Sequence, residues 1–168
     1  MKTVLHQFAA YNLWANSALC ACIQDLPPEV QTQQVVSSFT SLQATLLHMW
    51  DAENIWWQRM KLQELVVRPS DDFKGATPAV IKGLLDTSKQ WADWVQEALP
   101  HMLAHEFIYQ TSKKEKFKQP VYQMLLHLFN HSTYHRGQLV TLLRQLQADA
   151  IPATDFIVWS RSHGYKEA

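Results

Sequence analysis

Two histidines four residues apart, His131 and His135, have the spacing in this 168-residue chain that best suits chemistry. On an α-helix, residues at positions i and i+4 lie one above the other on the same face. Both imidazole rings can then point at one metal ion, as paired histidines do in zinc sites. The same nitrogens accept nickel, iron or manganese, so the spacing indicates part of a divalent-metal site without naming the metal.

The apolar residues around this pair recur with the 3.6-residue period of a helix and form a single stripe. His135 falls inside the stripe and His131 lies at its edge, so both rings are expected to face the protein interior. An interior ring needs a partner, because an unpaired buried polar group is costly. That partner is either a metal ion or a hydrogen-bonding carbonyl or carboxylate group. The stripe consists of Val121, Met124, Leu125, Leu128, Leu139, Leu142, Leu143 and Leu146.

The third candidate ligand is His48, in a long segment without proline or glycine that is expected to be helical. Its neighbours one turn away on either side are Ala44 and Ala52. Small residues beside an inward-facing ring leave a space that a close-packed core would not keep, and a metal ion with its water or substrate would fill it. Close approach of a second helix at the alanines is the alternative. His127 lies further from the stripe and is expected to support the site or face the surface.

These side chains must be positioned by the helices that the sequence pattern predicts. Four long helices are expected, over residues 3–24, 37–65, 77–99 and 120–148. Alternating residues within 103–119 favour a small β-hairpin or an extended flap between the third and fourth helices. A short aromatic segment, 155–159, follows the last helix. Without repeats or low-complexity tracts, we expect an all-α four-helix bundle that forms a single domain over residues 1–168.

The composition excludes two kinds of partner. Lys and Arg together number 15, as do Asp and Glu, and no basic stripe marks a nucleic-acid interface. No apolar run is long enough to span a membrane, and the first residues lack the core of a signal peptide. Cys20 and Cys22, two positions apart on a helix, face different directions and are expected to stay reduced. We therefore expect a cytoplasmic protein without a nucleic-acid or membrane partner.

Three sequence blocks, together with His48, resemble the DinB family of damage-inducible bacterial proteins. They are residues 11–16 (YNLWAN), 130–138 (NHSTYHRGQ) and 152–156 (PATDF). The block at 130–138 is fairly specific, and the resemblance covers nearly the whole chain. It implies a four-helix bundle with an up-down-down-up connection.

The resemblance also implies a metal-binding triad, with one histidine from the second helix and two from the last. The matching residues are His48, His131 and His135, the same set that the helical pattern selects. Several DinB relatives are thiol-dependent transferases or isomerases that use low-molecular-weight thiols, whereas most have no known activity. The expected cofactor is a divalent metal ion, with zinc or nickel favoured and iron or manganese as alternatives.

Two classes of function are open at this point. Three imidazoles leave a position on a zinc ion for water or substrate, which is typical of a catalytic site. We therefore expect a metal-dependent enzyme with a small-molecule substrate. The DinB resemblance implies an S-transferase or isomerase that uses a low-molecular-weight thiol, and a metal-dependent hydrolase is the alternative. No general base is obvious, because Asp51, nearly one turn from His48, is offset around the helix. The other class is a non-catalytic stress-response module in which the metal joins the second helix to the fourth.

Other polar and small residues suggest supporting roles. Asn12 and Asn16 share the apolar face of the first helix, where they either orient a metal ligand or bound water, or bridge helices. Arg136 lies off the apolar stripe and is expected to pair with a carboxylate. Gly137 stands inside a helix at a cost of about 1 kcal/mol, and is expected to mark close approach of the hairpin or the chain end.

A homodimer is expected because the second helix has two apolar faces, whereas a bundle helix normally has one. Clustered exposed aromatic residues are typical of association surfaces, and the first helix adds a flat outer strip. The alternative is that segment 103–119 or the tail 156–159 of the same chain covers the tryptophans. The second-helix face consists of Phe39, Leu46, Trp50 and Trp57, and the first-helix strip of Ala10, Trp14, Ala18 and Ala21.

Overall fold

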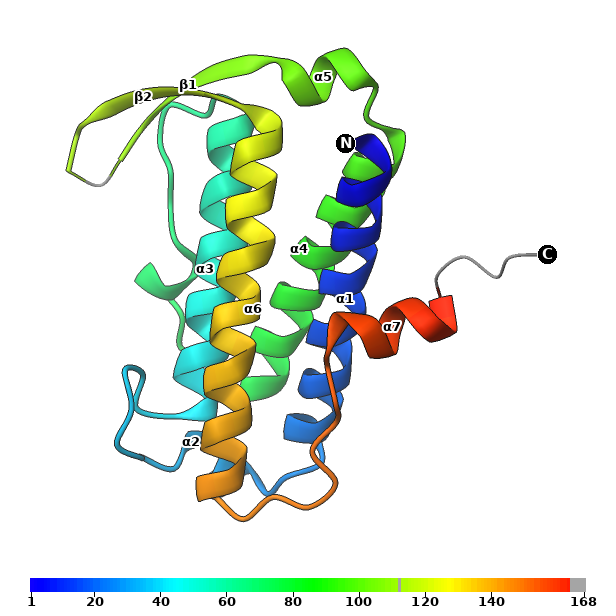
Figure 1. The fold of residues 1–168 in the computed structure, drawn as a ribbon. Helices are drawn as coiled ribbons and strands as arrows, with labels where there is room; N and C mark the ends of the chain where they lie inside the picture. Colours follow the sequence, from blue (N-terminus) through cyan, green and yellow to red (C-terminus); the bar gives the residue numbers. More distant parts are fainter. Residues whose placement is uncertain (112, 164–168) are drawn as a thin grey trace.

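The computed structural model describes residues 1–111 and 113–163, and it consists of helices with one β-hairpin (Figure 1). Four long helices form the body of the molecule, as the sequence pattern predicts. They are α1 (Lys2–Gln24), α3 (Leu42–Met60), α4 (Thr77–Glu97) and α6 (Val121–Gln145). The prediction of a helical bundle with a hairpin is therefore confirmed.

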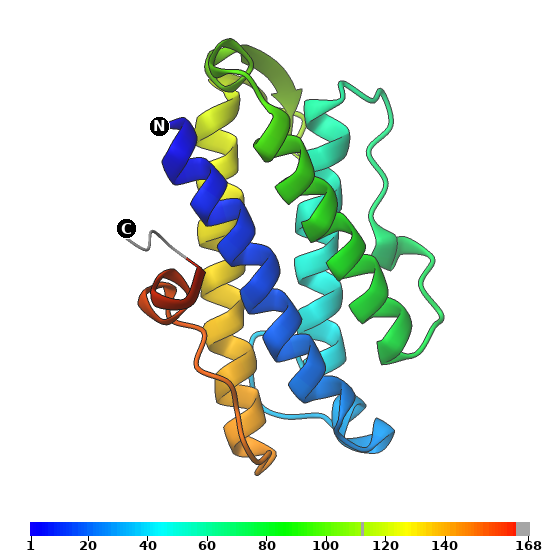
Figure 2. The ribbon, with the colours of Figure 1, turned by 90° about the vertical axis from the view of Figure 1, so that its right-hand side faces the viewer.

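The four long helices pack as a ring in which α1 contacts α4 and α6, and α3 contacts the same two helices. The chain runs in one direction along α1 and α6 and in the opposite direction along α3 and α4 (Figures 1 and 2). This arrangement is the expected up-down-down-up connection. It requires the segment between α3 and α4 to return along the whole length of the bundle, which residues 61–76 do.

Two apolar clusters fill the interior, one toward each end of the bundle. Trp91 and Phe129 are the largest fully buried residues of the first cluster, and Leu19, Leu46 and Leu142 belong to the second. Burying one such side chain contributes roughly 1.5–3 kcal/mol, so the two clusters hold the helices together. Between the clusters every long helix carries buried polar residues, which form a layer across the middle of the bundle.

Helix α3 is shorter at both ends than the predicted range 37–65. At its start, the Ser41 hydroxyl caps the helix by accepting a hydrogen bond from the Ala44 N–H at 3.1 Å. Near its end, the Gln58 side chain bonds both the N–H and the carbonyl of Val67, at 2.9 and 2.7 Å. This pair of bonds folds the following loop back against the helix, and Leu62 takes a left-handed conformation at φ 53°.

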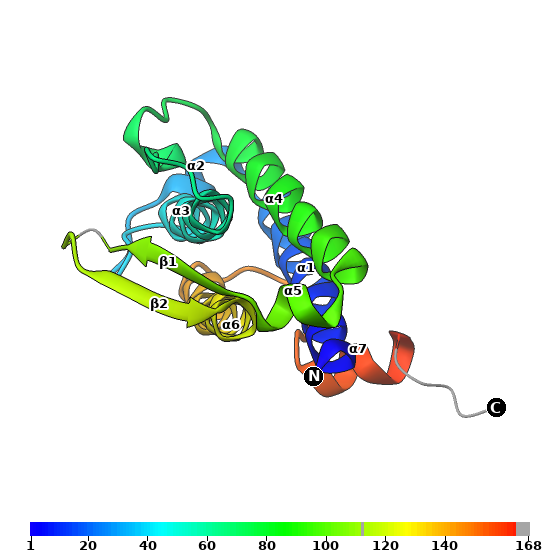
Figure 3. The ribbon, with the colours of Figure 1, turned by 90° about the horizontal axis from the view of Figure 1, so that it is seen from above.

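The segment before α6 forms the predicted hairpin, after the short helix α5 (Pro100–Ala104). Strands β1 (Glu106–Gln110) and β2 (Lys116–Pro120) are antiparallel, with Glu106 opposite Pro120 and Gln110 opposite Lys116. Seen from above, the hairpin lies along the outer side of α3 and α6, away from α1 and α4 (Figure 3). Strand β1 contacts α3 and strand β2 contacts α6.

Three short elements complete the described chain: α2 (Pro28–Thr32), the 3₁₀ turn η1 (Pro69–Asp71) and α7 (Phe156–His163). The tail helix α7 packs against α1, where the rings of Phe156 and Trp159 meet that of Tyr11 at 5.2 and 6.1 Å. The Tyr11 hydroxyl also donates to the Thr154 carbonyl at 2.6 Å. The predicted aromatic tail segment therefore closes onto the first helix.

The aromatic face of the second long helix, which suggested a homodimer, packs against another helix of the same chain. That argument for a homodimer was therefore wrong. Leu46 is fully buried in the core, and the Trp50 indole lies directly against Gly83 of α4. The ring of Trp57 meets that of Trp91, also on α4, at 4.9 Å. Neither the hairpin nor the tail provides this cover; α4 does.

The part of the chain that the structure describes has no helix long and apolar enough to cross a bilayer.

Candidate metal centre

The structure brings together the three histidines that the sequence selected, His48 from α3 and His131 and His135 from α6. One ring nitrogen of each lies within 4.8 Å of the other two. The Nε2 atoms of His131 and His135 are 3.1 Å apart, and the His48 ring centre lies 4.5 Å from that of His135. Three ring nitrogens converging in this way form half or more of the coordination sphere of a divalent ion.

The ring of His135 is held by Gln138, one turn further along α6. The Gln138 carbonyl oxygen lies 2.7 Å from Nδ1 of His135, so that nitrogen carries the proton and donates it. The other nitrogen, Nε2, is then free of a proton and faces the cluster. A hydrogen bond on the remote ring nitrogen is the usual way in which a histidine ligand is oriented. Gln138 belongs to the 130–138 block, but the sequence alone indicated no role for it.

His131 carries the least satisfied nitrogen of the cluster. Its Nδ1 atom is buried and has no hydrogen-bond partner among the described residues. Burial, followed by the neighbouring rings of His135 and His48, lowers the pKa of His131 to about 4. The ring is therefore neutral at physiological pH, which is the state in which imidazole binds metals.

His48 closes the cluster from the opposite helix. Phe39 was predicted on the helical face opposite His48, and that prediction was wrong: the residue precedes α3, and its ring stacks on the His48 ring at 4.4 Å. Burial, and secondly His135, lower the pKa of His48, whereas Asp51 acts in the opposite direction. The Asp51 carboxylate accepts a hydrogen bond from the Ser70 N–H at 2.9 Å, so it fixes the loop after α3. His48 and His131 are both partly exposed, so solvent reaches the cluster.

The middle of the bundle contains a buried carboxylate that sequence reasoning missed. Glu53 of α3 is fully buried, and its carboxylate accepts hydrogen bonds from the side-chain amides of Asn12 and Asn16, at 2.9 and 3.2 Å. Ser88 donates to it at 2.7 Å and Ser132 at 3.5 Å. Burial raises the pKa of Glu53 to about 7, although these donors and the charge of Arg136 oppose the shift. The inward asparagines were the signal that could have located this partner.

Arg136 lies in the same layer and departs from its predicted role. It is 2 % exposed and donates to the amide oxygens of Asn12 and Asn16, at 2.7 and 2.9 Å, and to Thr133 at 2.7 Å. The two asparagines thus stand between the arginine and Glu53, accepting from one and donating to the other. They bridge α1 to α3 and α6, which was one of the two roles open from the sequence. Within the described residues Arg136 bonds no carboxylate directly, contrary to expectation.

Neither cysteine belongs to the histidine cluster. Cys20 is buried and free, and burial raises the pKa of its thiol to about 12. Burial also raises the pKa of the free thiol of Cys22. A thiolate is the nucleophilic form, and burial disfavours it at both positions.

His127 stands beside the cluster, with its ring 5.8 Å from that of His131 and 5.4 Å from that of Trp56.

Comparison with known proteins agrees with this architecture. The sequence model of the DinB family matches residues 1–162. A curated relative, Protein DinB of Bacillus subtilis (strain 168), is 26% identical over 164 residues that cover 87% of each chain. Among solved structures, a DinB-like protein from Bacillus cereus ATCC 10987 superposes with a TM-score of 0.64 and 16% identity, over 83% of this chain and 90% of that one.

The fold and the histidine cluster together define a helical bundle with a candidate metal centre between its second and last long helices. The chain belongs to the DinB family.

Proposed function

We propose that this protein is a divalent-metal-dependent enzyme whose metal ligands are His48, His131 and His135. The observation that carries the proposal is the convergence of three ring nitrogens within 4.8 Å, on rings whose lowered pKa keeps them neutral. Two facing nitrogens 3.1 Å apart need a shared proton or a shared cation between them. A metal ion satisfies this requirement for all three rings at once.

The number of ligands favours a catalytic site over a structural one. Closed structural zinc sites use four protein ligands, whereas catalytic sites use three and leave room for water or substrate. The cluster in the described residues contains three histidines and no cysteine, aspartate or glutamate. The partial exposure of His48 and His131 gives a small molecule access to the site. The alternative of a metal that only joins α3 to α6 has less support from this arrangement.

The surrounding residues favour a thiol over water as the group that the metal activates. A bound divalent ion lowers the pKa of a coordinated thiol or water. A free thiol, with a pKa of about 8.5, needs a small shift to become a thiolate at neutral pH, whereas water at about 15.7 needs a large one. Asp51, the acidic residue nearest His48 in sequence, is engaged by Ser70, so it is poorly placed to assist a water molecule. Neither cysteine of the chain lies in the histidine cluster, so in this proposal the thiol is a small-molecule substrate.

In this proposal the chain's own residues bind and orient. Gln138 holds the protonated Nδ1 of His135 so that Nε2 faces the metal, and the ring of Phe39 forms an apolar wall over His48. The reaction class is transfer of a small-molecule thiol to an electrophile, or an isomerisation that passes through thiol addition. Hydrolysis is the second candidate.

Metal analysis of the protein purified without an affinity tag tests the proposal first. We expect about one divalent ion per chain, and loss of stoichiometric binding in His48→Ala, His131→Ala or His135→Ala. His101→Ala and His163→Ala are the matched controls, because both residues lie outside the cluster. Full metal occupancy in a His48→Ala/His135→Ala double variant would contradict the assignment.

An activity screen then separates the reaction classes. The metal-loaded protein is incubated with cysteine or 2-mercaptoethanol and an aryl halide, and in parallel with an aryl ester in the absence of thiol. We expect metal-dependent conjugation of the thiol that is lost in His48→Ala. Ester hydrolysis without conjugation would assign the site to the hydrolase alternative, and inactivity in both arms, with metal bound, would favour the structural role.

A further inference from the structure

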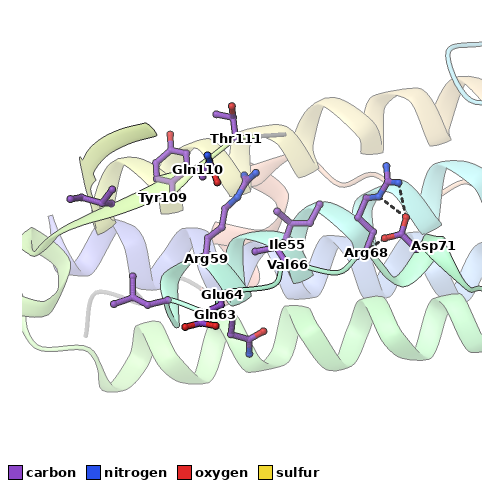
Figure 4. Close-up of a pocket in the computed structure, with 12 residues that line it drawn as sticks. Ile55, Arg59, Gln63, Glu64, Val66, Arg68, Asp71, Tyr109, Gln110 and Thr111 are labelled. Carbon is purple, nitrogen blue, oxygen red and sulfur yellow. Dashed lines mark hydrogen bonds and ion pairs between the residues drawn. The ribbon is translucent and has the colours of Figure 1, made fainter. Parts of the chain in front are cut away.

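A hollow lies between the end of α3, the loop that follows it, and strand β1 (Figure 4). Its volume is about 630 Å³, which is in the range of small-molecule sites. The three histidines are not among its lining residues. Its apolar wall includes Ile108 and Leu62, which are 60% and 66% exposed. The charged side chains that line it are Arg59, Glu64, Arg68 and Asp71.

Arg59 is the cation of this cavity without a counter-ion in the described part of the chain. Its Nε atom is buried and makes no hydrogen bond, and no described carboxylate lies within 4.0 Å of its guanidinium. Arg68, in contrast, is neutralised by Asp71, which accepts from its Nε at 2.9 Å and its Nη2 at 2.6 Å. A guanidinium stays charged at all physiological pH values, so Arg59 keeps its charge and its free donors.

Two aromatic rings hold the Arg59 guanidinium at the cavity. Its central carbon lies 4.8 Å from the Trp56 ring centre and 5.5 Å from that of Tyr109. The side chain points toward Gln110 of β1, whereas Glu64 points away from it (Figure 4). Ring contacts orient the group but satisfy none of its N–H donors.

The neighbouring polar groups are already used elsewhere. The Tyr109 hydroxyl donates to the Gln119 side chain at 2.6 Å, and the Gln110 amide donates to the Lys114 carbonyl at 2.9 Å. His127 faces Arg59 from α6, where burial and secondly the positive charge of Arg59 lower its pKa. Among the described residues, therefore, no carboxylate of α3, α6, the hairpin or the loop after α3 lies within 4.0 Å of the guanidinium.

We propose that this cavity binds a small organic monocarboxylate, with its carboxylate on the Arg59 guanidinium and its apolar body against Ile55, Val66 and Ile108. The planar guanidinium matches a carboxylate through two parallel hydrogen bonds. A single negative charge fits because one cation is unpaired, while the carboxylates of Glu64 and Asp71 on the same cavity disfavour a multiply charged ligand. The proposal is independent of the metal centre.

Titration of the ¹⁵N-labelled full chain with 3-phenylpropionate and with its neutral amide tests this assignment. We expect the acid to bind about tenfold tighter than the amide or more, because hydrogen bonds to a charged group are worth that difference. The backbone N–H signals of Ile108 and Tyr109 should shift when the acid binds. In Arg59→Gln the preference for the acid should fall to within about twofold, and Arg59→Lys should retain part of it.

Two controls make the experiment decisive. Arg68→Gln removes a cation from the same cavity that is already paired, so the preference for the acid should persist. The His48→Ala/His135→Ala variant excludes carboxylate binding to a metal at the histidines, and it should also keep the preference. Equal binding of acid and amide, absence of binding by both, or a preference that survives Arg59→Gln would overturn the proposal.

Discussion

At the scale of single residues, the histidine cluster is adapted to stay neutral. Burial is the first cause of the lowered pKa in His48, His131 and His135, and in the first two the neighbouring rings add to it. A protonated ring cannot bind a metal, so the pKa of each ligand sets the lower pH limit of binding. In the proposed metal site, this local environment would extend metal binding to more acidic solution than three exposed histidines would allow.

Metal affinity measured between pH 7.5 and pH 5.5 tests this point. Three unperturbed histidines, with a pKa of about 6.5, would lose roughly a thousandfold in affinity over this interval through protonation. We expect a loss of less than about a hundredfold, followed by a steep fall toward pH 4, near the pKa of His131. Competition titrations with a chromophoric chelator at each pH provide the measurement. A thousandfold loss by pH 5.5 would show that the rings titrate as exposed groups.

Glu53 makes the stability of the fold depend on pH in the opposite direction from metal affinity: the free energy of unfolding falls as the pH rises. Its pKa is raised from 4.5 to about 7, so the native state binds the proton more tightly than the unfolded chain does. Its contribution to the free energy of unfolding is fully present below about pH 4.5 and is lost as the pH rises through about 7. Glu53→Gln cannot ionise and should lack this dependence.

Urea unfolding of both proteins at several values between pH 4.5 and pH 8 measures the difference. Relative to Glu53→Gln, the wild type should lose roughly 3 kcal/mol of unfolding free energy over this range. The comparison cancels the titration of the histidines, which is common to both proteins. If the free energy of unfolding changed with pH in the same way in both proteins, the partners of Glu53 would hold its pKa near the ordinary value.

At the scale of elements, the packing of α3 against α4 depends on a glycine. A Cβ atom at Gly83 would overlap the indole of Trp50, whereas a Cβ at Gly137 of α6 would meet no described atom within 4 Å. The expected close approach at Gly137 was therefore wrong, and the contact lies at Gly83 instead. Gly83 therefore has to lack a side chain, whereas Gly137 does not.

The two substitutions to alanine should consequently differ in sign. Gly137→Ala should raise the free energy of unfolding by about 1 kcal/mol, the difference in helix propensity. Gly83→Ala gains the same propensity but overfills the α3–α4 contact at a cost of about 1–3 kcal/mol, so it should lower stability or leave no gain. Chemical denaturation of both variants checks this. Equal stabilisation by the two would show that Trp50 moves aside freely.

At the scale of the whole molecule, a homodimer remains a proposal with a different surface. The aromatic face of α3 is covered by α4, so the remaining candidate is the outer strip of α1, where Ala10 and Ala21 are exposed and Trp14 and Ala18 are partly exposed. Sedimentation should then show a dimer for the wild type and for His101→Ala, and a monomer for Ala18→Glu. Trp50→Glu should instead destabilise the chain, because its indole packs against α4. A wild type that is monomeric at high micromolar concentration would remove the proposal.

The sequence alone was sufficient for the local features of this protein. The 3.6-residue period of apolar residues predicted the four long helices, and i, i+4 spacing placed His131 and His135 on one face, because both depend only on helix geometry. The inward direction of His48 followed from the same geometry. The alternation in 103–119 was enough to predict the hairpin.

Contacts between elements were decided by the tertiary structure. The cap at Ser41 and the bonds of Gln58 to Val67 set the ends of α3, and these depend on side chains meeting distant backbone. Glu53 became the centre of a polar layer because α1, α4 and α6 all present donors to it, which no periodicity on α3 reveals. The aromatic face of α3 likewise packs against α4. A helical pattern fixes which residues share a face, but only packing decides what that face meets.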